Sequence, residues 1–172
     1  MLEGKHIAIL AEEDFEDAEL MQPLRAMNDA GASVMIVGSG SKKSYRGKMG
    51  SAEVTADATA DKVDAGQFDA IIVPGGYAPD KMRLHQPMID LVRKANAAGK
   101  VIAAVCHGPQ LLISAEVVKG RRVTSWPSVA VDLRNAGAIW VDQAVVRDGN
   151  IITSRKPADL PQFNEAIIEA LR

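Results

Sequence analysis

The amino-acid sequence predicts an α/β sandwich built around a mainly parallel sheet. Three observations support this fold class. Short apolar runs of strand length recur along the chain, amphipathic helical patterns separate them, and the runs are apolar throughout instead of alternating with polar residues. Continuous apolar runs are typical of strands covered on both faces, and regular strand–helix alternation favours a parallel sheet between helical layers. We expect residues 1–172 to form a single domain.

The first half of the chain contains two clear strand patterns. The apolar run His6–Ala11 predicts the first strand, and Ser33–Val37 predicts the second. A helix is expected between them over Asp17–Ala30. Pro23 lies inside that helix and predicts a kink or a late, irregular start. Residues 39–57 are polar and glycine-rich, and predict a loop or a small hairpin.

The second half continues the alternation. Strands are expected at Asp69–Val73, Val101–Val105 and near Arg122–Ser125. Helices are expected at Pro87–Ala98, near Pro109–Ala115, near Val129–Ala136 and at Leu160–Leu171. A hairpin is expected over Val145–Ile152. The Asp-Gly pair in that hairpin is a strong turn signal. Ligands of such sheets bind beyond the carboxyl ends of the strands, so functional residues are expected there.

The composition limits the classes of partner. Of 172 residues, 20 are Lys or Arg and 22 are Asp or Glu, so the formal net charge is −2. Without a basic excess, neither nucleic acid nor a membrane surface is an expected partner. The chain has no leader-like apolar run, and its single cysteine cannot form an internal disulfide, which predicts a cytoplasmic protein. Neither a metal-ligand spacing nor a nucleotide-binding glycine motif occurs, so no metal and no cofactor are expected.

The segment around Cys106 is the most informative part of the sequence. A nucleophile on a sharp strand-to-helix turn needs small residues two positions before and after it, and Ala104 and Gly108 fulfil that requirement. The following helix, starting near Pro109, would lower the pKa of the thiol. His107 could act as the base of a Cys–His pair. The alternative interpretation is a structural cysteine buried after a core strand.

Two further segments meet the same edge of the predicted sheet. Residues 12–17 contain five acids, and one carboxyl facing Cys106 could donate a hydrogen bond to the thiolate when protonated. The sequence leaves open which acid that is, and acids at a helix N-terminus are also favoured by the helix dipole. The Gly75-Gly76 pair suits an oxyanion hole, because backbone N–H groups of glycines approach ligands closely. It also suits a plain tight turn.

Taken together, these segments resemble the PfpI-like intracellular cysteine peptidases. That group belongs to the wider superfamily of the parkinsonism-associated deglycase and the class I glutamine amidotransferase domains. The matching segments, which run in family order from residue 5 to the end of the chain, are Glu13–Asp17, Val73–Asp80, Ala104–Gln110, Thr124–Pro127 and Ser154–Asp159. The resemblance implies a flavodoxin-like three-layer sandwich with Cys106 as the nucleophile.

The resemblance also implies roles for other residues of the site. Glu16 takes the place of the protonated carboxyl that is hydrogen-bonded to the Cys106 thiolate. The oxyanion donors would be backbone N–H groups of Gly75, Gly76 and His107. In this family His107 would be oriented by an acid of a neighbouring subunit, which here is Asp80 where the archetypal peptidases carry Glu. The protein is therefore expected to be a homo-oligomer, a dimer or an assembly of dimers.

Three residues are implied to lie around the pocket: Tyr77, Trp126 and Arg155. The function implied is that of a cysteine-dependent, stress-related hydrolase acting on glyoxal-type carbonyl adducts, as a deglycase or glyoxalase. Two alternatives stand beside it. One is an intracellular cysteine peptidase with the same mechanism and a peptide substrate. The other is a non-catalytic stress protein that uses Cys106 as a redox sensor.

Overall fold

A seven-stranded sheet forms the centre of the protein, for which a computed structural model describes all 172 residues. The strand order is β10-β11-β7-β6-β1-β2-β5, and only β10 runs antiparallel to its neighbour. The strands of this sheet are β1 (His6–Ala11), β2 (Ser33–Gly38), β5 (Ala58–Thr59), β6 (Ala70–Val73), β7 (Val101–Val105), β10 (Val145–Asp148) and β11 (Ile151–Ser154). The mainly parallel α/β architecture predicted from the sequence is confirmed.

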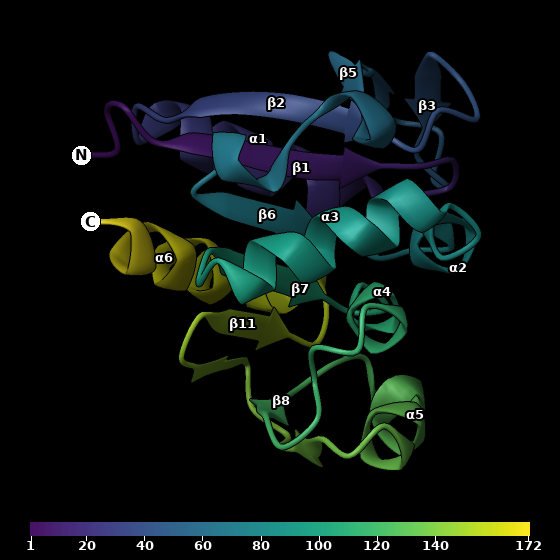
Figure 1. Ribbon diagram of the computed structural model, residues 1–172, viewed down its shortest axis with the longest axis vertical. Helices are drawn as coiled ribbons and strands as arrows, with labels where there is room; N and C mark the ends of the chain where they lie inside the picture. The colour runs from purple at the N-terminus through teal and green to yellow at the C-terminus, as the bar shows by residue number, and fades with distance from the viewer.

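Helices cover both faces of the sheet (Figure 1). Helices α1 and α6 pack together on one face, and α3 and α4 pack on the other, with α2 beside α4. The helices are α1 (Asp17–Asp29), α2 (Ala78–Met82), α3 (Gln86–Ala97), α4 (Pro109–Ser114), α5 (Ala130–Asn135) and α6 (Leu160–Leu171). None of them has the length and apolar character needed to cross a membrane.

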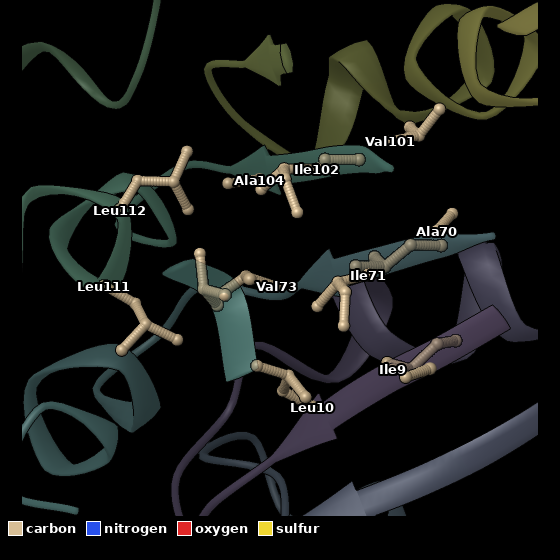
Figure 2. Close-up of a cluster of buried hydrophobic side chains, with 14 of the residues drawn as sticks. Ile9, Leu10, Ala70, Ile71, Val73, Val101, Ile102, Ala104, Leu111 and Leu112 are labelled. Carbon is tan, nitrogen blue, oxygen red and sulfur yellow. The ribbon is translucent and has the colours of Figure 1, made fainter. Parts of the chain in front are cut away.

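The core is one continuous cluster of buried side chains, and it explains why the strands read as unbroken apolar runs. Figure 2 shows Ile9 of β1, Ile71 of β6 and Ile102 of β7 in neighbouring strands, with Leu111 and Leu112 of α4 beside them. All five side chains are fully buried. Because both faces of these strands are covered by helices, neither face requires polar residues.

Some elements differ from the sequence predictions. Helix α1 begins at Asp17 and continues unbroken past the buried Pro23, so the predicted late start is wrong. Residues 39–57 do contain a small hairpin, formed by β3 (Ser44–Arg46) and β4 (Glu53–Thr55). Helix α2 was not predicted, because its five residues are too short to show a helical apolar period.

The last third of the chain adds a separate pair of short strands and the hairpin at the edge of the main sheet. The strand predicted near Arg122–Ser125 is shorter, as β8 (Arg122–Val123), and pairs in parallel with β9 (Ile139–Trp140). The predicted Asp-Gly hairpin is present as β10 and β11. Both chain termini lie at the amino ends of the strands (Figure 1), so the carboxyl edge is left to the loops that carry the candidate site.

Candidate active site

Cys106 sits at the sharp turn between β7 and α4 predicted from the sequence. Its φ is +62°, a left-handed conformation that non-glycine residues adopt at a cost. The turn requires a glycine two residues later: a Cβ on Gly108 would lie 2.9 Å from the carbonyl oxygen of Val105. The chain therefore accepts backbone strain at the one residue that carries a thiol.

The carboxyl beside this thiol belongs to Glu19, in the first turns of α1. Glu19 is fully buried, and its Oε1 accepts a 2.9 Å hydrogen bond from the backbone N–H of Gly75. A Cβ on Gly75 would contact both Glu19 Oε1 and the Cβ of Cys106, so the three residues share one small volume. Glu19 Oε2 is buried and has no hydrogen-bond partner.

The expectation that Glu16 fills this position is wrong. Glu16 is the residue before α1, and its Oε2 lies 2.9 Å from Nζ of Lys48. The reason is the phase of the helix. Glu19 shares the inward face with Pro23 and Met27, at spacings of four residues, whereas Glu16 precedes the helix and turns outward. This spacing is the sequence signal that could have identified Glu19.

Burial shapes the ionisation of the two groups. It raises the pKa of Glu19 to about 8, against the opposing hydrogen bond from Gly75, so the carboxyl is protonated at neutral pH. Burial also raises the pKa of the Cys106 thiol, and a negative charge on Glu19 would raise it further. The two groups therefore titrate as a pair, because both cannot be ionised side by side in a buried pocket. When the thiol ionises, the protonated Glu19 can donate its free O–H to the sulfur.

The backbone N–H groups of His107 and Gly76 donate to no backbone oxygen of the protein, and that of His107 faces the sulfur of Cys106. Their role as oxyanion donors stays a prediction. Gly75 differs from the expectation, since its N–H is used by Glu19 and its carbonyl oxygen accepts from the N–H of Glu16. Gly75 thus holds the acid in place and leaves the oxyanion role to its neighbours.

His107 lies against the nucleophile, with its Nδ1 3.4 Å from Sγ of Cys106. Burial, with a smaller effect of the Lys48 charge, lowers the pKa of this imidazole, so it is neutral at pH 7 and can accept a proton. Asp80, expected to reach His107 of another subunit, is exposed on α2 and forms no hydrogen bond or ion pair within its own chain. Its role remains a prediction.

The three other residues expected around the pocket, Tyr77, Trp126 and Arg155, differ in exposure and in their contacts. Tyr77 is 65% exposed and Trp126 is 40% exposed, and the N–H of Trp126 donates a 3.0 Å hydrogen bond to the carbonyl oxygen of Cys106. The guanidinium of Arg155 is held by Asp159 and Asp142, at distances of 3.0 Å. Arg155 therefore supports the loop after β11 and makes no contact with the thiol.

Sequence reasoning missed Lys48 and Asp17, which lie on the same side of the site. Lys48 pairs with Glu16, and its Nζ is 5.3 Å from the centre of the Tyr77 ring. Asp17 is buried and accepts hydrogen bonds from the segment that follows Lys48. Their contacts join residues about 30 positions apart, which no local pattern reveals. Elsewhere, no group of three or more His, Cys, Asp or Glu side chains is arranged to hold a metal ion.

A flavodoxin-like sheet with a strained cysteine at a strand-to-helix turn, beside a buried carboxylic acid, defines a class of α/β proteins organised around a reactive thiol. The chain belongs to the DJ-1/PfpI family, whose sequence pattern matches residues 5–170. This agrees with the resemblance found in the sequence.

The sequence similarity to named relatives extends over almost the whole chain. It is 43% identical to protein/nucleic acid deglycase 2 of Escherichia coli, covering 98% of this chain and 97% of that protein. It is 41% identical to deglycase PfpI of Pyrococcus furiosus, covering 96% and 99%. Among solved structures, a two-domain protein of Anabaena variabilis with DJ-1/ThiJ/PfpI-like and ferritin-like domains matches with a TM-score of 0.95 and 43% identity, covering 97% of this chain and 48% of that one.

Proposed function

We propose that this protein is a cysteine-dependent deglycase that releases amines or thiols from their adducts with glyoxal-type carbonyl compounds. One observation carries the proposal: Cys106 stands on a strained turn beside the buried carboxyl of Glu19, and the nearby N–H groups of His107 and Gly76 donate to no backbone oxygen. Relatives named as deglycases, more than 40% identical over nearly the whole chain, support the same reaction class.

The reaction balances with water as the only co-reactant. For a methylglyoxal hemiaminal, the thiolate of Cys106 forms an S–C bond to the former aldehyde carbon while the amine leaves with a proton. Transfer of hydrogen from that carbon to the neighbouring ketone carbon gives a thioester, and water then cleaves the S–C bond. The products are the free amine and lactate, so the aldehyde carbon is oxidised and the ketone carbon is reduced within one molecule. Free methylglyoxal would enter the same sequence at the thiol addition step.

Each step has a group suited to it. The N–H groups of His107 and Gly76 would hold the developing oxyanion, and Glu19 would move protons at the sulfur and the adjacent carbon. Peptide hydrolysis makes a stronger demand, because an unactivated amide nitrogen must be protonated as it leaves. His107 would have to serve as that acid, and within this chain no carboxylate orients its imidazole. Free methylglyoxal has no leaving group to protonate, so carbonyl chemistry makes a smaller demand on His107 than peptide hydrolysis does.

We also propose that the site is completed by a second copy of the chain. Asp80 is exposed at the edge where Tyr77 and Leu84 are also exposed, at 65% and 81%. A carboxylate of the neighbouring subunit could then reach His107. Light scattering on wild type and on Asp80→Asn gives the assembly state. A protein that is monomeric at assay concentrations contradicts this arrangement.

The deciding experiment follows lactate formation from the methylglyoxal adduct of an amine or thiol, in wild type and Cys106→Ser. Rates are compared with those of free methylglyoxal at the free concentration that the adduct releases by itself. We expect faster turnover of the adduct, and a loss of at least about a thousandfold in Cys106→Ser, because the hydroxyl is a far weaker nucleophile at neutral pH.

Other results would identify the alternatives. Equal rates on the adduct and on its released methylglyoxal would mean a glyoxalase that acts on the free aldehyde. Absence of lactate in both proteins rejects carbonyl chemistry and leaves two assays. Cleavage of peptides that is lost in Cys106→Ser would show a peptidase. A mass increase of 32 Da at Cys106 under mild peroxide, without any turnover, would show a redox sensor.

A further inference from the structure

Lys48 is a charged residue at the site to which the proposed mechanism gives no task. Its side chain is 30% exposed, its Nζ lies 2.9 Å from Oε2 of Glu16, and it stands over the face of Tyr77. An ammonium group that contacts both an aromatic face and a carboxylate is restricted in position. We propose that the ammonium group of Lys48 favours the thiolate form of Cys106, and that Glu16 sets the strength of this effect.

The backbone fixes Lys48 at the site edge. Its N–H donates a 2.8 Å hydrogen bond to the carbonyl oxygen of Phe15, and the N–H of Glu16 donates one of 3.1 Å to the carbonyl oxygen of Gly75. Gly75 in turn holds Glu19 beside the thiol. Two backbone hydrogen bonds and the Phe15–Glu16 peptide bond thus connect Lys48 to Glu16 and to Gly75.

Asp17 holds the segment after Lys48 in position. Its carboxylate accepts hydrogen bonds from the N–H groups of Met49, Ser51 and Ala52, at 2.9, 3.0 and 2.8 Å. A buried carboxylate with three backbone donors fixes a loop far more firmly than a surface ion pair does. Lys48 therefore extends from a clamped segment and not from a freely moving hairpin.

The charges around the thiol determine the direction of the effect. Glu16 and Lys48 act on the Cys106–Glu19 pair, the His107 imidazole lies 3.4 Å from the thiol, and Lys48 is the one cation among these three groups at neutral pH. Its charge lowers the pKa of both the thiol and Glu19. The negative charge of Glu16 raises the pKa of Glu19. Removing the cation and removing the anion should therefore shift thiol ionisation in opposite directions.

This inference rests on the proposed function only for its importance to turnover, and its test uses no substrate. Iodoacetamide, a neutral reagent, forms an S–C bond with the thiolate and releases iodide, so its rate follows the thiolate fraction. Cys106 is the only thiol in the chain, so each alkylation event occurs at the site. The second-order rate constant is measured at several pH values below the midpoint of thiol ionisation, where it is proportional to the thiolate fraction, on the full-length wild type and variants, with circular dichroism confirming that each is folded.

We expect Lys48→Met to move the midpoint of the pH profile upward by about 0.5 to 1 unit, which slows alkylation about three- to tenfold below the midpoint. Glu16→Gln keeps an oxygen acceptor for Lys48 but removes the negative charge, so the midpoint should move downward. Lys48→Arg should restore the wild-type midpoint. The matched control is Lys42→Met, which removes the 2.8 Å pair with Glu13 from the same part of the chain and should leave the midpoint unchanged.

Two results would overturn the inference. One is a Lys48→Met profile that coincides with those of wild type and Lys42→Met. The other is a shift in the same direction for Lys48→Met and Glu16→Gln, which would mean that loss of the ion pair disturbs the structure and that charge is not the cause. If wild type does not turn over the adduct while the alkylation profiles of the variants shift as expected, the result counts against the proposed function alone.

Discussion

Two acids near the start of α1, Asp17 and Glu19, are both buried yet have opposite environments. Asp17 is 6% exposed and accepts four hydrogen bonds, from Met49, from Ala52 and twice from Ser51. Glu19 is fully buried and accepts one, from Gly75. Burial alone would raise both pKa values. The four donors outweigh it at Asp17, whose pKa is lowered, while the pKa of Glu19 is raised to about 8.

The difference shows how one helix turn can hold a structural acid and a chemical acid. A buried carboxylate with a full set of donors is an anion that stabilises its surroundings. A buried carboxyl with one unsatisfied oxygen keeps its proton and can exchange it with a neighbour. The degree of hydrogen-bond satisfaction, more than burial, separates the two roles.

The largest effect is expected from Glu19→Gln. The amide can still accept from Gly75 N–H and donate to the sulfur, but it cannot transfer a proton. Turnover of the methylglyoxal adduct should therefore fall by about a hundredfold or more, while alkylation of Cys106 by iodoacetamide continues. Lactate assays and alkylation rates on the same preparation measure both quantities. Turnover near the wild-type rate would mean that Glu19 is a structural acid like Asp17.

A pair of glycine substitutions should separate the two acids in the folded protein. A Cβ on Gly75 would press against Glu19, and a Cβ on Gly47 would press against the carboxylate of Asp17. We expect Gly47→Ala to lower the free energy of unfolding by about 2–3 kcal/mol, because it displaces a clamp with several donors. Gly75→Ala should lower activity by a larger factor than the accompanying loss of stability explains. Urea unfolding and adduct turnover, measured on both variants, give the comparison.

Asp17→Asn tests the structural acid directly. The amide leaves backbone donors without an acceptor, so the free energy of unfolding at pH 7 should fall by about 2–3 kcal/mol. The pKa of Asp17 lies below its unfolded value near 3.8, so its contribution is present above about pH 4 and is lost as the pH falls toward the lowered folded pKa. The difference between variant and wild type should therefore shrink in acid.

The matched control for this pH dependence is again Glu19→Gln. Because the folded pKa of Glu19 is raised to about 8, its contribution is complete below about pH 4.5 and is lost as the pH rises toward 8. Relative to Glu19→Gln, wild type should thus gain stability as the pH falls through that window. Urea titrations at several pH values measure both trends. A pH-independent difference for Asp17→Asn contradicts the role assigned to its charge.

The smallest effect is expected from Glu12→Gln, a third buried acid. Glu12 is 3% exposed and accepts from the hydroxyls of Ser39 and Ser41 and from the N–H of Glu13. Hydroxyls can rotate and accept from an amide, whereas backbone N–H groups cannot reverse their role. The free energy of unfolding should fall by no more than about 1 kcal/mol. A loss as large as that of Asp17→Asn would show that the kind of donor does not matter.

Much of the fold could be predicted because a strand that is buried on both faces has a continuous apolar sequence. His6–Ala11 and Val101–Val105 were predicted with the bounds that the structure shows. Helix α2 and the two-residue strand β9 could not be predicted, because they are too short for a period and are formed by contacts with distant parts of the chain. The turn at Cys106 was predictable, since tight packing there demands small neighbours at fixed positions.

The site was only partly predictable for a related reason. The sequence places several acids before and within the first turn of α1, and the choice among them depends on the rotation of the helix against the sheet. Glu19 lies on the same inward face as Met27, and this four-residue spacing is the sequence signal for its position. Lys48 left no signal, because its position depends on backbone hydrogen bonds to Phe15 and on the clamp at Asp17.

The left-handed backbone of Cys106 has a consequence for selection experiments. A non-glycine residue in that conformation carries about 1 kcal/mol or more that glycine would not. A library randomised at position 106 and sorted only for thermal resistance should therefore enrich glycine and asparagine. The same library sorted for thiol-dependent turnover should return cysteine. At position 106, the residue that gives the highest thermal stability therefore differs from the residue that gives activity.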